Sequence, residues 1–200
     1  MNKDAESSQK NKQGDLNIKQ KMSEINDAVN NILNKITIKE NKMVSTEDIC
    51  NAAEQITNSK FNLYSMSLKK ELDRSFKDCG AITTKDNDNE FTIILNSDND
   101  AKYRRFSLIH EIGHIVLNAP NFEIGKFVAS FHINYKVNHL DEITDVITLN
   151  EEMANIFALC VLMPEKNFLN DILKKDIITV SKIYGVTPEA VKSRFDLILE

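Results

Sequence analysis

The residue types that could do chemistry stand closest together in the segment His110-Glu111-Ile112-Gly113-His114. On a helix, two histidines four positions apart project from one face about one turn apart, so both imidazoles can reach a single ion. Zinc suits two neutral imidazole nitrogens plus a carboxylate, with a fourth position left open for water. Glu111 lies beside that face and can take a proton from the water without itself binding the ion. The motif therefore predicts a hydrolytic zinc site with His110 and His114 as ligands and Glu111 as general base.

A third ligand must come from elsewhere in the chain. No histidine stands six positions after His114, which excludes the longer zinc motif that carries a third histidine. The best donor is a carboxylate in residues 150–158, where positions 151, 154, 155 and 158 share one helical face. Glu151 belongs to that face. The two alanines on the same face, Ala154 and Ala158, allow a close approach to the helix that carries the histidines, at Gly113. Asn155, one turn after Glu151, could accept the free ring N–H of a liganding histidine and fix its tautomer.

Two questions about the predicted site stay open. Glu152 lies about 100° round the helix from Glu151, which predicts a surface charge or an acid on the substrate side, but it is also the alternative ligand. A polar side chain near the metal usually stabilises the oxyanion in such hydrolases. The segment between the two helices offers His132, Tyr135 and His139 for that role.

Both halves of the site require helices, and the sequence supplies their start and stop signals. Residues 96–100 can cap a helix that runs to about Asn118, before Pro120, and a second helix over about 150–163 ends at Pro164. Ahead of them we expect a capped helix from Ser45 and strands at residues 61–66, 79–84 and 91–95, with a hairpin loop at 85–89. Residues 119–149 are ambiguous and strand-like in part, over 127–137. The pattern predicts a small sheet in front of an active-site helix pair.

Composition narrows the class of protein. The 200 residues are 42% hydrophobic and 28% charged, which is typical of a soluble globular domain that needs no disulfide to hold its fold. A net charge of −5 is unfavourable for non-specific nucleic-acid binding. Three cysteines without a C-x-x-C pair indicate a reducing compartment. The N-terminus has no apolar signal region, and the longest apolar run, residues 156–163, is far short of the roughly 20 residues of a membrane span, so we expect a cytoplasmic protein.

Two segments together resemble the ImmA/IrrE family of metallo-endopeptidases: residues 105–114, Arg-Phe-Ser-Leu-Ile-His-Glu-Ile-Gly-His, and residues 151–164, which begin Glu-Glu-Met-Ala-Asn. The resemblance covers about residues 44–198. It implies an α+β, zincin-like metallopeptidase domain with bound zinc, and it matches Glu151 to the family's glutamate ligand. It also implies that the substrate is a helix-turn-helix repressor of the Cro/CI type, cleaved to release genes of mobile elements or stress responses.

We therefore expect a disordered tail at residues 1–14, an amphipathic helix within 15–43, the zinc metallopeptidase domain at 44–174 and a C-terminal helical segment at 175–200. The apolar residues from Ile18 to Ile36 alternate spacings of four and three, which predicts packing on the body or a partner, with a short coiled coil as the alternative.

The C-terminal segment has the outline of a helix-turn-helix: a helix, a stop at Gly185, and a second start at Thr187-Pro188. Residues 174–200 hold five basic and four acidic side chains, which favours packing or substrate docking over DNA binding. The rival function is a non-catalytic regulator that uses the metal fold and its terminal helices as a protein- or DNA-binding platform. Glu111 argues against that rival, because a platform has no need of a general base.

Overall fold

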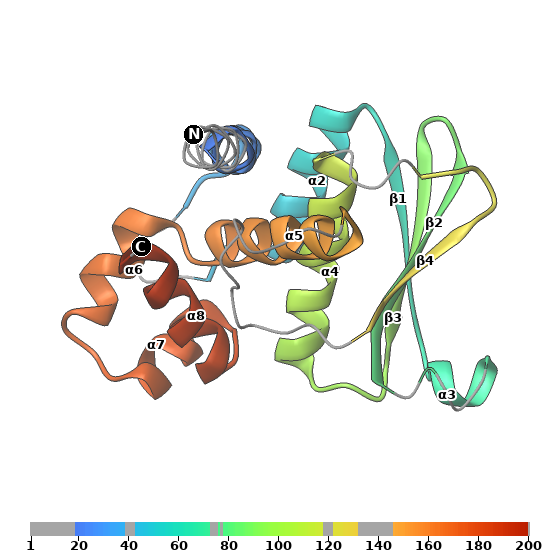
Figure 1. Ribbon diagram of the computed structural model, residues 1–200. Helices are drawn as coiled ribbons and strands as arrows, with labels where there is room; N and C mark the ends of the chain where they lie inside the picture. Colours follow the sequence, from blue (N-terminus) through green and yellow to red (C-terminus); the bar gives the residue numbers. More distant parts are fainter. Residues whose placement is uncertain are drawn as a thin grey trace, which may run out of the picture.

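The computed structural model describes residues 19–38, 43–72, 76, 78–117, 122–131 and 146–199. A four-stranded sheet is covered on one face by helices, and further helices lie beyond them (Figure 1). The α+β architecture predicted from the sequence is confirmed. The elements are α2 (Thr46–Thr57), β1 (Lys60–Met66), α3 (Leu68–Glu71), β2 (Cys79–Asn87), β3 (Glu90–Asn96), α4 (Ala101–Val116), β4 (Phe127–Phe131), α5 (Val146–Leu162), α6 (Glu165–Ile172), α7 (Ile177–Tyr184) and α8 (Pro188–Leu199).

The sheet has the strand order β1-β3-β2-β4. β1 runs parallel to β3, whereas β2 pairs antiparallel with both β3 and β4. The β2–β3 hairpin turns at Asp88 and Asn89, so the expected loop over residues 85–89 is shorter than predicted. Lys85 pairs with Phe91 and Asn87 with Glu90, across a register shift. Polar side chains on an exposed hairpin end face water while their backbones stay paired, so polarity alone did not mark where the strand ends.

The main hydrophobic core lies between the sheet and the helices. Phe91 and Ile93 of the sheet belong to one buried cluster with Phe106 and Ile109 of α4. Figure 1 shows α2 and α4 along this face of the sheet, with α5 on the far side of α4. A smaller cluster around the buried Leu68, at the start of α3, covers part of the opposite face. α4 is therefore held between a sheet and a second helix, and its side chains are fixed from both sides.

α2 and α4 begin where the sequence predicts a cap, whereas α5 begins at Val146, about one turn before the expected start near residue 150. Ser45 Oγ accepts the backbone N–H of Asp48 at 3.3 Å at the start of α2. Asp100 Oδ1 accepts the backbone N–H groups of Lys102 and Tyr103 at 2.8 and 3.0 Å at the start of α4. Such caps satisfy amide groups that have no partner within the helix.

The chain is helical again at both ends of the described region. Residues 19–33 form the N-terminal helix, whose Ile25, Val29 and Ile32 are buried against the body of the same chain. At the other end, Gly185 caps α7 with a φ of 62°, a left-handed conformation that favours glycine. Among the described residues no single helix is both long and apolar enough to cross a membrane; α5 and α6 meet that test only together, across a bend of 71°. The expected tail, residues 1–14, lies outside the described residues.

Candidate metal centre

Two histidines on consecutive turns of α4 form the first half of the site. The structure buries both His110 and His114 completely. Their ring centroids lie 4.6 Å apart with the ring planes nearly perpendicular, and their Nε2 atoms are 3.0 Å apart. The i, i+4 spacing therefore brings two imidazole nitrogens to one point inside the fold, as the motif predicts.

Glu151, in the second turn of α5, completes a group of three ligand atoms. Its Oε2 lies 3.2 Å from His110 Nε2, and its Oε1 lies 3.2 Å from His114 Nε2. One ligand atom from each of the three side chains lies within 4.8 Å of the other two. The Glu151 side chain is 35% exposed while both histidines are buried, so the site meets solvent on the side of the carboxylate.

The electrostatics of this group favour an ionised carboxylate. Burial alone would raise the pKa of Glu151, but hydrogen bonds and charge from His110 and His114 outweigh it and hold the pKa below its usual range. An ionised acid facing two imidazoles is the donor set that a divalent cation uses, because the ion replaces the protons that would otherwise join these groups.

The geometry fits zinc. Two ligands at about 2.0–2.1 Å from a tetrahedral zinc ion lie about 3.3 Å apart, which is close to the separations of 3.0 and 3.2 Å found here. Three protein ligands leave the fourth tetrahedral position open, as in catalytic rather than structural zinc sites. His110, His114 and Glu151 are thus the residues that would hold the ion.

Asn155 lies where the sequence places a partner for a liganding histidine. His110 Nδ1 and Asn155 Oδ1 are 2.9 Å apart, and both side chains are buried. The amide oxygen accepts a hydrogen bond from Nδ1–H, so the proton of the neutral ring stays on Nδ1 and Nε2, the nitrogen that faces Glu151, keeps its lone pair for an ion. Glu151 and Asn155, one turn apart on α5, therefore contact the same histidine from its two ends.

Close contact between α4 and α5 makes this arrangement possible. A Cβ atom added at Gly113 would lie 2.9 Å from Phe157 Cδ1 and 3.3 Å from the Cα and carbonyl oxygen of Ala154. A glycine inside a helix costs about 1 kcal/mol relative to alanine. Here its missing side chain lets the backbone of α5 approach, as the alanines on the Glu151 face predict.

Glu111, between the two histidines, is buried and held from the sheet. Its Oε2 accepts a hydrogen bond of 2.6 Å from Thr83 Oγ1 on β2, and both residues are fully buried. Its other oxygen, Oε1, is buried and has no hydrogen-bond partner among the described residues. Sequence reasoning missed Thr83, because nothing in the run Ile82-Thr83-Thr84 distinguishes the inward threonine from its neighbour.

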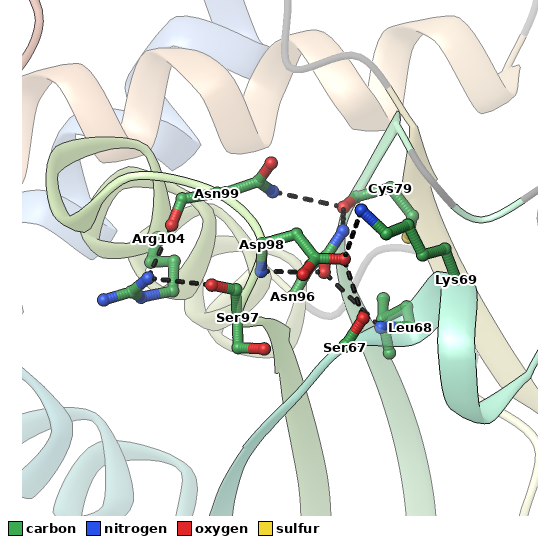
Figure 2. A network of polar contacts seen from close by, with 9 residues as sticks. All are labelled: Ser67, Leu68, Lys69, Cys79, Asn96, Ser97, Asp98, Asn99 and Arg104. Carbon is green, nitrogen blue, oxygen red and sulfur yellow. Dashed lines mark hydrogen bonds and ion pairs between the residues drawn. The ribbon is translucent and has the colours of Figure 1, made fainter.

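The N-terminal end of α4 is anchored through the turn that follows β3 (Figure 2). Asn96 is fully buried; its Nδ2 donates to the carbonyl oxygen of Cys79 at 2.9 Å, and its Oδ1 accepts the backbone N–H of Asp98 at 3.2 Å. Asp98 in turn accepts a hydrogen bond of 2.7 Å from the Ser67 hydroxyl, just ahead of α3. This network ties the start of α4 to β2 and α3, so the helix that carries both histidines has a fixed position against the sheet.

Four other candidates have different outcomes. Glu152 is only 3% exposed, so the expected surface charge is wrong. From this residue to Leu162 every side chain of α5 is buried, so the side of the helix that carries Glu152 does not face solvent. His132, Tyr135 and His139, the candidate oxyanion stabilisers, lie outside the described residues.

Arg105, within the segment that precedes the histidines, contacts the backbone ahead of α2. Its guanidinium donates to the carbonyl oxygen of Val44 at 2.6 Å and to the hydroxyl of Thr46. Burial lowers the pKa of Arg105 to about 10. Arg105 thereby joins α4 to the start of α2, away from the three ligand atoms.

A comparison with protein families agrees with this geometry. Residues 75–196 match the model of the IrrE N-terminal-like domain, in peptidase family M78. The matched region is more than half of the chain and contains both α4 and α5. No curated protein shows significant similarity to the chain.

Proposed function

The chain belongs to the metallopeptidase family of IrrE N-terminal-like domains, and from this premise we propose that it is a zinc-dependent endopeptidase that makes limited cuts in a helix-turn-helix repressor. The observation that carries the proposal is the convergence of His110, His114 and Glu151 beside Glu111, whose Oε1 has no partner among the described residues. In this proposal the enzyme acts in the cytoplasm, where such repressors bind DNA.

The donor set supports zinc as the ion. Two imidazoles and one carboxylate, without a thiolate, form one of the ligand sets found in catalytic zinc sites. When bound, zinc supplies Lewis-acid chemistry: it polarises a carbonyl oxygen and makes a water molecule more acidic. Asn155 supports the site by fixing the His110 ring, since its amide oxygen holds the proton on Nδ1.

The protein's own part in the reaction falls to Glu111. Its Oε1 accepts a proton from the attacking water, and the same carboxyl later gives that proton to the leaving amine. The carboxylate is available for this because, within the part of the chain that the structure describes, Thr83 engages Oε2 and nothing engages Oε1. Burial of Glu111 keeps competing water away from the base.

The substrate proposal follows from the family and from the edge of the sheet. β4 is the last strand in the order β1-β3-β2-β4, and its Val128 pairs with Thr83, the residue that contacts Glu111. An extended substrate segment added along β4 would be aligned by main-chain hydrogen bonds and separated by β4 from β2, the strand whose Thr83 contacts the base. A segment of a repressor that unfolds locally could bind in this way.

The experiment that tests the proposed function uses mass spectrometry. Zinc-loaded protein is incubated with the repressor encoded beside its gene, and with casein as an unrelated unfolded protein. We expect one or a few new termini in the repressor, little cleavage of casein, and neither with Glu111→Gln. Equal digestion of both proteins, or cleavage by Glu111→Gln, would contradict limited proteolysis at this site.

A further inference from the structure

We propose that Thr83 is a positioning residue for the general base: its hydroxyl fixes the carboxylate of Glu111 in one orientation and leaves Oε1 free to take the proton. This inference rests on the proposed function, because it assigns Glu111 the role of base. It adds a residue from the sheet to a site whose other members all come from α4 and α5.

The contact itself is short and buried. Thr83 Oγ1 donates to Glu111 Oε2 at 2.6 Å, and both residues are 0% exposed. Glu111 Oε1, by contrast, has no hydrogen-bond partner in the described part of the chain. One carboxylate thus has one oxygen held and one oxygen unengaged, and a buried polar atom without a partner is costly enough to need a reason.

Thr83 lies on an interior strand of the sheet. It pairs with Ile93 of β3 on one side and with Val128 of β4 on the other, so its backbone is fixed within the sheet. A β-branched side chain has few χ1 rotamers, so its hydroxyl keeps its direction once the backbone is set. The sheet therefore presents the Thr83 hydroxyl to Glu111 in a fixed direction.

Glu111 needs such a donor. Its side chain has three rotatable bonds, and its neighbours His110 and His114 are committed to the ligand cluster. A proton can pass efficiently only when donor and acceptor lie within hydrogen-bond reach and in line. By engaging Oε2, Thr83 removes rotation of the carboxylate and decides which oxygen faces the reaction.

A merely structural role for the hydrogen bond makes different predictions, and the chain offers a matched control. Thr84 is the next residue on β2, half-buried and, because side chains alternate along a strand, on the opposite face of the sheet. Thr83→Val removes the hydroxyl at nearly constant shape, Thr83→Ser keeps it, and Thr84→Val makes the same chemical change on the other face.

The first measurement is the kinetics of repressor cleavage by the zinc-loaded variants, together with zinc per chain and melting temperature. Thr83→Val should lower kcat by about tenfold to a hundredfold, with KM and zinc content unchanged, since a misplaced catalytic group costs rate rather than binding. Thr83→Ser should restore kcat, and Thr84→Val should match the wild type. A Thr83→Val protein that melts lower but keeps its kcat would assign the hydrogen bond a structural role only and overturn the inference.

The second measurement needs no activity. In crystal structures the Glu111 carboxylate should occupy one orientation in the wild type and Thr83→Ser, and more than one in Thr83→Val. An unchanged single orientation in Thr83→Val would overturn the inference. If the wild type cleaves no repressor, the proposed function fails while the crystal structures still decide the role of Thr83. Should Thr83→Val not fold, Thr83→Ala takes its place under the same criteria.

Discussion

Two adjacent glutamates on α5 occupy different environments, and this difference defines the metal centre at the scale of single residues. Glu151 is partly exposed and lies 3.2 Å from each of two histidine nitrogens. Glu152 is buried and turned about 100° away round the same helix. Of these two chemically identical side chains, Glu151 therefore belongs to the ligand cluster and Glu152 to the protein interior.

The ligand assignment predicts opposite metal contents for two isosteric variants. Glu151→Gln replaces an ionised ligand with a neutral amide, so we expect zinc affinity to fall strongly. Glu152→Gln should keep about one zinc per folded chain, even if the substitution lowers the free energy of unfolding. Metal analysis after dialysis against a weak chelator makes the comparison. Full occupancy in Glu151→Gln together with loss in Glu152→Gln would show that the ligand is the neighbouring acid.

At the scale of elements, the contact between α4 and α5 carries the site, because each helix supplies part of the ligand set. Gly113 is the residue at which the two backbones approach, against Ala154 and the fully buried Phe157. The added methyl of Gly113→Ala would have to displace an aromatic ring or separate the helices. Helix propensity favours the alanine by about 1 kcal/mol, whereas overpacking a core costs about 1–3 kcal/mol.

Gly113→Ala should therefore lower the free energy of unfolding by up to about 2 kcal/mol, despite the better helix propensity of alanine, and should weaken zinc binding. Urea denaturation and a zinc titration measure the two effects. Phe157→Leu provides the control, since it removes the ring atom that the new methyl meets. Its cost should be smaller in the Gly113→Ala background than in the wild type; equal costs in both backgrounds would disprove this source of strain.

A contact between α6 and α7 makes the stability of the fold depend on pH. Tyr184 donates a hydrogen bond of 2.9 Å to Asp171 Oδ2, and both residues are buried. Burial, followed by the hydrogen bond and the charge of Asp171, raises the pKa of Tyr184 above its ordinary value. A raised pKa in the folded state stabilises the fold below the pKa of the unfolded chain, and this contribution is lost as the pH rises above about 10.

We therefore expect the stability advantage of the wild type over Tyr184→Phe to shrink as the pH rises above about 10. Urea denaturation of both proteins at about pH 8.5 and about pH 11 tests this, and the titration of lysines common to both cancels in the difference. A constant difference between the two proteins over this range would contradict the role of the buried hydroxyl.

At the scale of the whole molecule, the C-terminal helices resemble a helix-turn-helix but present few basic groups for DNA. Arg194 on α8 is only 4% exposed; its Nε donates to the carbonyl oxygen of Met163 at 3.1 Å, and its guanidinium lies 3.7 Å from Glu165. Because the Arg194 guanidinium is buried and bonded within the fold, it is not available to bind DNA phosphates. Lys192 on the same helix is exposed, between the exposed acids Glu189 and Asp196.

The protein should accordingly show no salt-sensitive binding to duplex DNA at micromolar concentration. Gel-shift titrations at low and moderate salt measure this, with Lys192→Ala and Arg194→Ala as probes of α8. A sequence-specific shift that Lys192→Ala abolishes, in a protein that remains folded, would favour the non-catalytic regulator instead.

The sequence predicts this molecule well where the signal is local. The His110–His114 spacing, the caps at Ser45 and Asp100, and the small-residue face shared by Glu151 all depend on positions within a turn or two. Prediction from the sequence fails where the environment of a side chain depends on segments that are distant in the chain. Which of two adjacent threonines faces Glu111 depends on the register of β2 against β3 and β4, and the burial of Glu152 depends on what surrounds α5.

We propose that one ion held by His110, His114 and Glu151 enables Glu111 to cut a repressor. Titration of zinc into metal-free protein, with cleavage of the repressor followed in the same samples, tests it most directly. Cleavage by the wild type should rise with occupancy and level off at about one zinc per chain, while Glu111→Gln binds the same amount of zinc and cleaves nothing. Full cleavage by the metal-free protein, or a repressor left intact at full occupancy, would contradict the claim.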